Sequence, residues 1–156
     1  LPEKDSTYVT KASYIDRLAT LYGWRVAEEI FFGADMITTG ASSDIERATE
    51  IARSMVMRYG FDEELGAENF ASDQLTDNYL GAEWQWKAIS EVTREKIDEK
   101  VRIILKSAYE RAKNIITTYR DTHEKIAMVL LEKEEMLALE FDGFFTDIAV
   151  PEKTVM

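Results

Sequence analysis

The 156-residue sequence contains no cysteine, so the chain can form neither a disulfide nor a thiolate metal site. This absence permits a reducing compartment without establishing one. No run of residues approaches the roughly 18 apolar residues of a membrane-spanning helix. The opening LPEKDSTY also lacks the basic and apolar segments of a signal peptide. The sequence therefore predicts a domain that is soluble as given.

Lysine and arginine are outnumbered by acidic residues, 19 to 30, which gives a formal net charge of -11. Nucleic acids and anionic membranes bind basic patches that displace their counterions, so this charge argues against both as direct partners. The acidic runs at 62–64 and 132–135 are typical of solvated helix faces and turns. With 46% hydrophobic and 31% charged residues, the composition predicts one globular domain with one core.

Apolar residues recur at three- and four-residue spacing along most of the chain, and the alternation typical of strands is almost absent. This pattern predicts an all-α fold, an antiparallel bundle of about four main helices. The first helix is expected over about 9–31, with Thr10 as its N-cap and Gly33 as its stop. Gly23 lies inside this helix, where glycine costs about 1 kcal/mol relative to alanine, so we expect another backbone to pack closely there.

The same spacing predicts the next two helices. A cap at Ser42 or Ser43 starts the second helix, and its apolar stripe ends at Gly60. The segment 61–85 is rich in turn residues and predicts a loop that contains at most a short strand. The longest helix is expected over about 86–119, where one apolar face continues for about eight turns.

Asp121 and Glu124 have the spacing of a capping box for a further helix. The sequence LALEFDGFF at 137–145 predicts a short amphipathic turn, and 149–156 is expected to be a frayed tail. No internal repeat or low-complexity segment appears, so 1–156 is expected to form a single domain.

His123 and Glu124 begin like HExxH, the zinc-peptidase motif in which two histidines one helical turn apart bind the metal and the glutamate activates water. The chain reads HEKIA instead, with Ala127 at the second histidine position. His123 is also the only histidine in the sequence. We therefore interpret His123 as a residue at a helix start, on a polar face.

Asp44 lies in the stretch ITTGASSDIERA, a polar turn that leads directly into a helix. A carboxylate in the first turn of a helix is stabilised by free backbone amides and by the helix dipole, so position alone favours a structural cap or first-turn acid. A metal ligand is the alternative. Glu28 and Glu29 are candidates for groups that orient a metal-bound histidine, although exposed helix acids are far commoner.

Several segments together resemble one protein family. They are GWRVAEEIFFG at 23–33, ITTGASSDIERATEIARSMVMRYGF at 37–61, the opening LPEKD, IDEKVRIILKSAYERAKNII at 97–116 and LLEKEEML at 130–137. They resemble the peptidase domain of the FtsH family of membrane-anchored, ATP-dependent zinc metalloproteases. The resemblance covers nearly the whole chain, and TTGASxDIERAT together with AEEI is highly specific.

The resemblance implies a zinc centre that this chain completes only in part. In that family an upstream HExxH supplies two zinc ligands and the general base, and the aspartate of TTGASxD supplies the third protein ligand. This role corresponds to Asp44. Glu28 is implied to lie near the metal, a task that Glu29 could share. A single carboxylate cannot hold zinc, so the isolated chain is expected to be inert.

The resemblance also implies the setting of the intact protein. Family members are homohexamers in which an ATP-binding ATPase ring feeds unfolded or membrane proteins to the peptidase ring. They are anchored in a bacterial membrane, facing the cytoplasm, or in a mitochondrial or plastid membrane. The peptidase segment itself is expected to make no direct membrane contact. Because HExxH, the ATPase module and the membrane anchor are not in this sequence, we expect it to be a piece of a longer chain.

The sequence departs from the family pattern at several positions. Trp24 replaces the second glycine of the family's GGR motif, and its bulk is expected to crowd a helix contact. Ser43 replaces an asparagine. After Gly81, where the family has arginine, the chain carries Trp84 and Trp86, which we interpret as packing or interface anchors.

Two hypotheses follow from the resemblance and its gaps. The chain is either the helical C-terminal part of an FtsH-type peptidase domain, or a catalytically degenerate relative that acts as a structural or assembly subunit. In the second hypothesis Asp44 persists only as a helix cap.

Overall fold

The computed structural model describes residues 9–71 and 89–146. Its regular elements are the α-helices α1 (Lys11–Leu21), α2 (Gly23–Phe32), α3 (Ser42–Met57), α4 (Glu91–Thr118), α5 (Arg120–Lys133) and α6 (Ala138–Gly143), and the 3₁₀ turns η1 (Ala34–Met36) and η2 (Thr39–Ala41). No strand occurs in the two described ranges. The prediction of an all-α fold is therefore confirmed.

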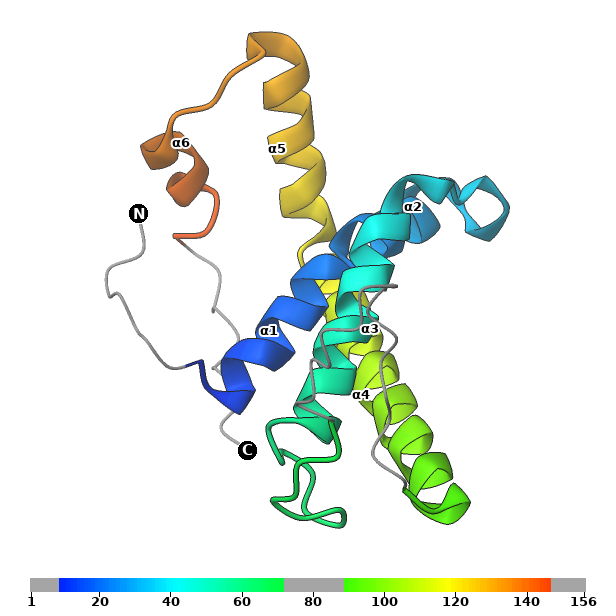
Figure 1. Cartoon of the computed structure of the whole chain (residues 1–156). Coiled ribbons are helices and arrows are strands. Elements are labelled where there is room, and N and C mark those ends of the chain that lie inside the picture. Colours follow the sequence, from blue (N-terminus) through cyan, green and yellow to red (C-terminus); the bar gives the residue numbers. More distant parts are fainter. Residues whose placement is uncertain (1–8, 72–88, 147–156) are drawn as a thin grey trace, which may run out of the picture.

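Helices α1 to α4 form the packed part of the molecule (Figure 1). α3 runs back along α1, and α4 returns along α3, so these long helices are antiparallel as predicted. α5 leaves the end of α4 and extends away from this bundle, and the chain then turns back to α6. None of the described helices combines the length and the hydropathy that a membrane crossing requires.

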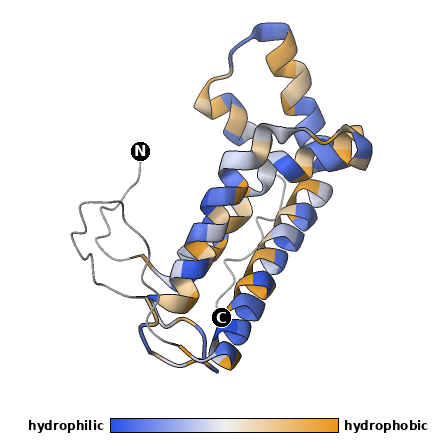
Figure 2. Cartoon of the chain, turned by 45° about the vertical axis from the view of Figure 1, so that its right-hand side comes forward, coloured by the Kyte–Doolittle hydropathy of each residue, from blue (hydrophilic) through white to orange (hydrophobic). Residues whose placement is uncertain are grey.

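Two clusters of buried apolar side chains hold the bundle together. In the first, the small residues Ala108 and Ala112 of α4 share a cluster with Leu18 of α1 and Val26 of α2, both fully buried. Burial of a side chain such as Leu18 contributes roughly 1.5–3 kcal/mol. The second cluster consists of Ala52, Val56, Met57, Phe70, Ile97 and Val101. Figure 2 shows hydrophobic and hydrophilic residues alternating along α4, as expected for a helix with one buried face.

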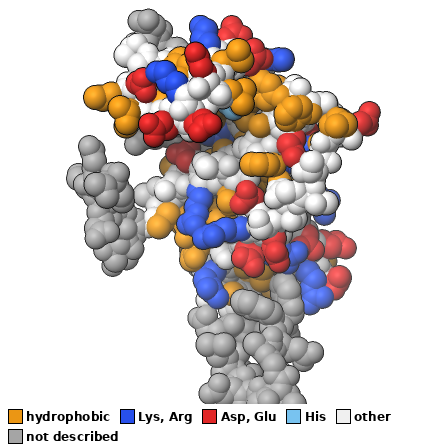
Figure 3. All heavy atoms as spheres, turned by 90° about the horizontal axis from the view of Figure 1, so that it is seen from above, with side chains coloured by type: hydrophobic (Ala, Val, Ile, Leu, Met, Phe, Trp, Pro, Cys, Tyr) orange, Lys and Arg blue, Asp and Glu red, His pale blue; other side chains and the backbone are white. Residues whose placement is uncertain are grey.

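The last two helices contribute little to these clusters. Neither α5 nor α6 has a buried residue. Their exposed large hydrophobic side chains are Met128, Leu130, Leu131, Leu137, Leu139 and Phe141. Figure 3 shows hydrophobic side chains lying among acidic ones on one face of the molecule.

The predicted first helix is two helices, α1 and α2, separated at Tyr22. The Tyr22 amide donates to the carbonyls of both Leu18 and Thr20, and the buried ring packs edge-on against Tyr109 of α4, with centroids 5.6 Å apart. Gly23 begins α2, and a Cβ placed there would meet nothing within 4 Å. The expected close backbone contact is therefore wrong. Glycine has a low helix propensity, and Gly23 directly follows the break between α1 and α2.

Two of the predicted helix ends are confirmed and one is wrong. Thr10 caps α1 by accepting a hydrogen bond in its first turn, and Gly33 ends α2 with a φ of 88°. Neither Ser42 nor Ser43 caps α3. The turn η2 runs directly into α3, so Ser42 is already helical and Ala41 occupies the N-cap position without a side-chain hydrogen bond.

The predicted capping box of Asp121 and Glu124 is also wrong. Only Tyr119 separates α4 from α5, and it precedes α5 without a side-chain capping bond. The His123 amide donates to the Tyr119 carbonyl, which is the first backbone bond of α5, and the Tyr119 side chain caps none of the amides before it. Glu124 instead accepts a hydrogen bond from Arg120 Nε at 3.0 Å.

α3 ends at Met57, before the predicted stop at Gly60. Gly60 has a φ of 61°, and the Cα of Ala67 would lie 2.8 Å from a Cβ placed on it, so this turn requires glycine. The Phe70 amide then donates to the Met57 carbonyl at 2.7 Å, and the Phe70 ring is buried in the second cluster. The described part of the predicted loop, 61–71, is thus held against the bundle and contains no strand.

Several predictions fall outside the described residues. These are the interpretation of Trp84 and Trp86 as anchors, the helix start near Trp86 and the frayed tail at 149–156. Within the described part, the longest helix begins at Glu91 with Ser90 as its N-cap, which accepts a hydrogen bond from the Thr93 amide.

Candidate functional site around Asp44

Asp44 lies in the first turn of α3 and is half-buried. Backbone amides at a helix N-terminus carry partial positive charge, which stabilises a carboxylate placed there. Asp44 is not the N-cap of this helix, and its side chain forms no hydrogen bond or ion pair with residues 9–71 or 89–146. Its carboxylate is therefore not committed to a structural contact in the described part of the chain.

Glu28 of α2 is buried, with 8% of its surface exposed. Its Oε1 accepts a hydrogen bond from Thr38 Oγ1 at 2.6 Å, and its Oε2 accepts one from the Thr38 amide at 3.2 Å. The Thr38 hydroxyl bond is the main reason that the pKa of Glu28 lies below its ordinary value, and hydrogen bonding from the Trp24 side chain adds to this effect. Both carboxylate oxygens of Glu28 thus hold the segment that leads to Asp44.

Trp24 lies one helical turn before Glu28, and its indole covers η2. A Cβ placed on Gly40 would lie 3.3 Å from Trp24 Nε1 and 3.2 Å from Thr38 Oγ1. The Gly40 amide donates to Thr38 Oγ1 at 3.1 Å. Trp24 remains 62% exposed, so its ring lies on the surface of the turn. The crowded contact expected at Trp24 is therefore with a turn and not with a helix.

Glu29 faces α4. Its carboxylate accepts hydrogen bonds from the Tyr109 hydroxyl and, at 3.0 Å, from Lys113 Nζ, and Arg25 Nη1 lies 3.4 Å away. The bonds from Tyr109 and Lys113 lower the pKa of Glu29. Burial and the bond to Glu29 raise the pKa of Tyr109 to about 12. Glu29 is a link between α2 and α4, and none of these contacts reaches η2.

His123 is exposed near the start of α5, as predicted. Its ring stacks on Phe31 of α2 with centroids 4.9 Å apart, and the Arg120 guanidinium lies over the same Phe31 ring. The described residues contain no group of three or more His, Cys, Asp or Glu side chains that could hold a metal ion. They do not form a metal site by themselves, so a metal at Asp44 would need ligands from elsewhere.

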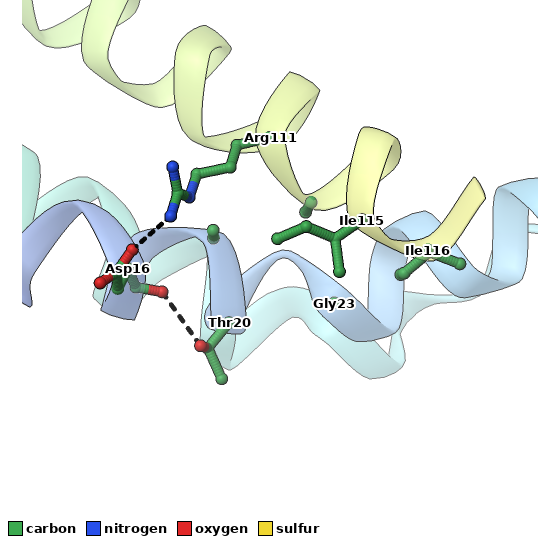
Figure 4. A pocket seen from close by; sticks show the side chains of 8 residues that line it. Asp16, Thr20, Gly23, Arg111, Ile115 and Ile116 are labelled. Atoms are coloured by element: carbon green, nitrogen blue, oxygen red, sulfur yellow. Dashed lines mark hydrogen bonds and ion pairs between the residues drawn. The ribbon is translucent and has the colours of Figure 1, made fainter. Parts of the chain in front are cut away.

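A shallow groove between α1 and α4 does not include Asp44 (Figure 4). Gly23, Ile115 and Ile116 line it, and an ion pair of 2.7 Å between Asp16 Oδ1 and Arg111 Nη2 closes one end. Ala19, Thr20 and Ala112 complete the lining, and the Thr20 hydroxyl already donates to the Asp16 carbonyl. Because an active site needs several polar groups that converge on a substrate, this groove is not the candidate site.

Sequence reasoning selected Asp44 and Glu28, and the structure connects them through the chain segment between α2 and α3. It missed Thr38 and Gly40. A threonine hydroxyl that binds the amide two residues later is a common turn pattern, and the Thr-Thr-Gly sequence is compatible with it. The bond from Thr38 to Glu28, ten residues earlier, carries no sequence signal because the path of the chain brings the two together.

The matching family model and the similar proteins point to the same peptidase family. The family model described as Peptidase family M41 matches residues 1–143. Proteins named ATP-dependent zinc metalloprotease FtsH are similar to this chain. That of Thermotoga maritima is 45% identical over 135 residues, covering 86% of this chain and 22% of the relative. That of Lactococcus lactis is 41% identical and that of Bacillus subtilis 38% identical, each over 98% of this chain and over 22% and 24% of the relative. The chain therefore spans less than a quarter of the length of these relatives.

Proposed function

This chain belongs to peptidase family M41, and we propose that it is the helical C-terminal part of the peptidase domain of an ATP-dependent zinc metalloprotease, in which Asp44 supplies one zinc ligand. The observation that carries this proposal is the free carboxylate of Asp44. It is half-buried at a helix N-terminus and has no partner among the described residues. A structural cap would instead be expected to bind backbone amides of its own helix.

The other zinc ligands come from a part of the parent protein outside these residues. Zinc in a catalytic site takes three protein ligands and leaves a position for water or substrate, and the described residues supply one candidate. The isolated chain is therefore inert in this proposal. In the parent, ATP binds an ATPase module, the subunits form a homo-oligomer, a hexamer as in the family, and unfolded or membrane proteins are the substrates. The parent is membrane-anchored, and this domain is its soluble peptidase part.

Replacing Asp44 in the parent protein tests the ligand role. We expect Asp44→Ala to reduce zinc per subunit to background and to abolish casein degradation, with the melting temperature of the zinc-free subunit nearly unchanged. Elemental analysis, a protease assay and thermal unfolding measure the three quantities. Asp35→Ala is the matched control, because Asp35 is an exposed acid in the first turn of η1. It should change none of them.

The same experiment separates the second hypothesis. If Asp44 is only a first-turn acid of an assembly subunit, Asp44→Ala lowers the melting temperature and leaves the activity of the assembled complex intact. That pattern would overturn the zinc-ligand proposal.

A further inference from the structure

Trp24 occupies an unusual place for a large aromatic side chain. It is mostly exposed, yet its indole lies directly over the backbone of Gly40, which belongs to another element. Gly40 does not have a positive φ, so a larger residue there would not strain the backbone. The space above Gly40 is limited by Trp24 Nε1 and by Thr38 Oγ1, at 3.3 and 3.2 Å from a Cβ.

The groups beneath the indole form a continuous set of hydrogen bonds. The Gly40 amide donates to Thr38 Oγ1, and the Thr38 hydroxyl and amide both donate to Glu28. Trp24 and Glu28 are one turn apart on α2, so the same helix face supplies the carboxylate and the aromatic cover. Together they fix the start of η2 against α2.

The turn η2 continues into α3 without an intervening residue. The Ser42 amide donates to the Thr39 carbonyl, and Ala41, the N-cap position, is buried. No side chain caps α3, so the backbone of η2 alone determines how its first turn begins. A shift of η2 is therefore transmitted to the turn that carries Asp44.

We propose that Trp24 is a positioning residue, which holds η2 against Glu28 and thereby sets the direction of the Asp44 carboxylate. This inference rests on the proposed zinc-ligand role of Asp44. It gives a structural role to Trp24, which replaces a glycine of the family pattern.

The first test is a double-mutant cycle in the 156-residue chain, with Trp24→Ala, Gly40→Ala and the double variant. A methyl group at position 40 must displace the indole, so Gly40→Ala should lower the melting temperature more when Trp24 is present than when it is replaced. The contact with Thr38 Oγ1 is the same in both backgrounds and cancels. Gly143→Ala is the matched control, because it lies in α6 and its Cβ would meet nothing within 4 Å. Its effect should be independent of position 24.

The second test distinguishes a positioning role from ordinary packing. The indole N–H resonance of Trp24, identified by its loss in Trp24→Phe, should shift in Glu28→Gln and in Thr38→Val. It should not shift in Thr39→Val, because the Thr39 side chain is exposed and takes no part in the bonds to Glu28. In the parent protein, Trp24→Ala should speed the removal of zinc by a chelator by about 10- to 100-fold, the usual effect of groups that orient metal ligands. Trp24→Phe, which keeps a ring over Gly40, should recover part of this loss.

The outcomes are separable. Additive effects at positions 24 and 40, or an unchanged rate of zinc removal in Trp24→Ala, would overturn the positioning role of Trp24. Retention of zinc by Asp44→Ala would instead overturn the proposed function, and the cycle in the isolated chain would still report on the contact between Trp24 and Gly40.

Discussion

Glu28 and Glu29 show how far neighbouring residues of the same type can differ. Successive residues on a helix point about 100° apart, so the two carboxylates face different parts of the molecule. Glu28 binds Thr38 and is buried, whereas Glu29 binds Tyr109 and Lys113 of α4. The pKa of both carboxyl groups is lowered, mainly by Thr38 for Glu28 and mainly by Tyr109 for Glu29. Glu28 acts on the candidate site through η2, and Glu29 holds the bundle together.

The Tyr109 hydroxyl provides a test at this scale. Tyr109→Phe removes a hydrogen bond to a carboxylate, so we expect the free energy of unfolding to fall by about 1.5–3 kcal/mol at neutral pH. The pKa of Tyr109 is about 12 in the folded chain and about 10 when unfolded. A raised pKa means that this stabilisation is present below pH 10 and is lost as the pH rises toward 12. Urea unfolding of both proteins should give a constant difference up to about pH 10 that shrinks above it. A difference that persists unchanged to pH 12 would contradict this account.

At the scale of elements, the segment after α3 is joined to α4 by charge as well as by Phe70. Lys100 Nζ lies 2.7 Å from Glu64 Oε2, and Lys96 Nζ lies 3.0 Å from Glu64 Oε1. The Asp62 side chain accepts from the amides of Glu64 and Leu65, which shapes the turn that presents Glu64. The hydrogen bond from Lys100, followed by that from Lys96, lowers the pKa of Glu64 to about 2.

The depressed pKa of Glu64 predicts an acid-sensitive contribution to stability. The ordinary value is 4.5, so the contribution is fully present above that pH and is lost as the pH falls toward 2. The difference in melting temperature between the original chain and Glu64→Gln should therefore shrink over this range. Glu64 is half exposed, so added salt should also reduce the difference. Glu63→Gln is the control, because Glu63 has no ion pair with a described residue. A salt-independent difference at pH 6 would argue against this ion pair.

At the scale of the molecule, the described residues divide into a packed bundle and a projecting arm. The bundle of α1 to α4 contains every buried side chain of the described helices, whereas α5 and α6 expose large apolar residues. The candidate site belongs to the bundle, because Asp44 and Glu28 lie on α3 and α2. The packed bundle therefore positions the Asp44 carboxylate, and in the proposed function the other metal ligands reach it from outside the described residues.

This division predicts the metal content of the isolated chain. We expect the purified 156-residue chain to contain no stoichiometric zinc and to degrade no casein, because a single carboxylate does not provide the three protein ligands of a catalytic zinc site. Elemental analysis and a casein assay measure both, with the parent protein purified in the same way as the control. One tightly bound zinc ion per chain would contradict the proposal that the other ligands come from elsewhere.

From the amino-acid sequence alone it was possible to predict the helical class, the Thr10 cap, the stop at Gly33 and the position of Asp44 in the first turn of a helix. These features depend on local patterns, in which residues interact with neighbours three or four positions away. The segments at 23–33 and 37–61, the second of which contains Asp44, also indicated the family. The ligand role of Asp44 stays a prediction.

The partners of the side chains between these positions became clear only from the way the helices and turns pack. The break at Tyr22 accompanies packing on α4, and the cap expected at Ser42 is replaced because η2 already begins the helical path. The bonds from Thr38 to Glu28, and the indole over Gly40, join residues 10 and 16 positions apart through the return of the chain from α2 to α3. Helix periodicity cannot specify such contacts, because they depend on the direction in which a turn leaves the helix and not on spacing within it.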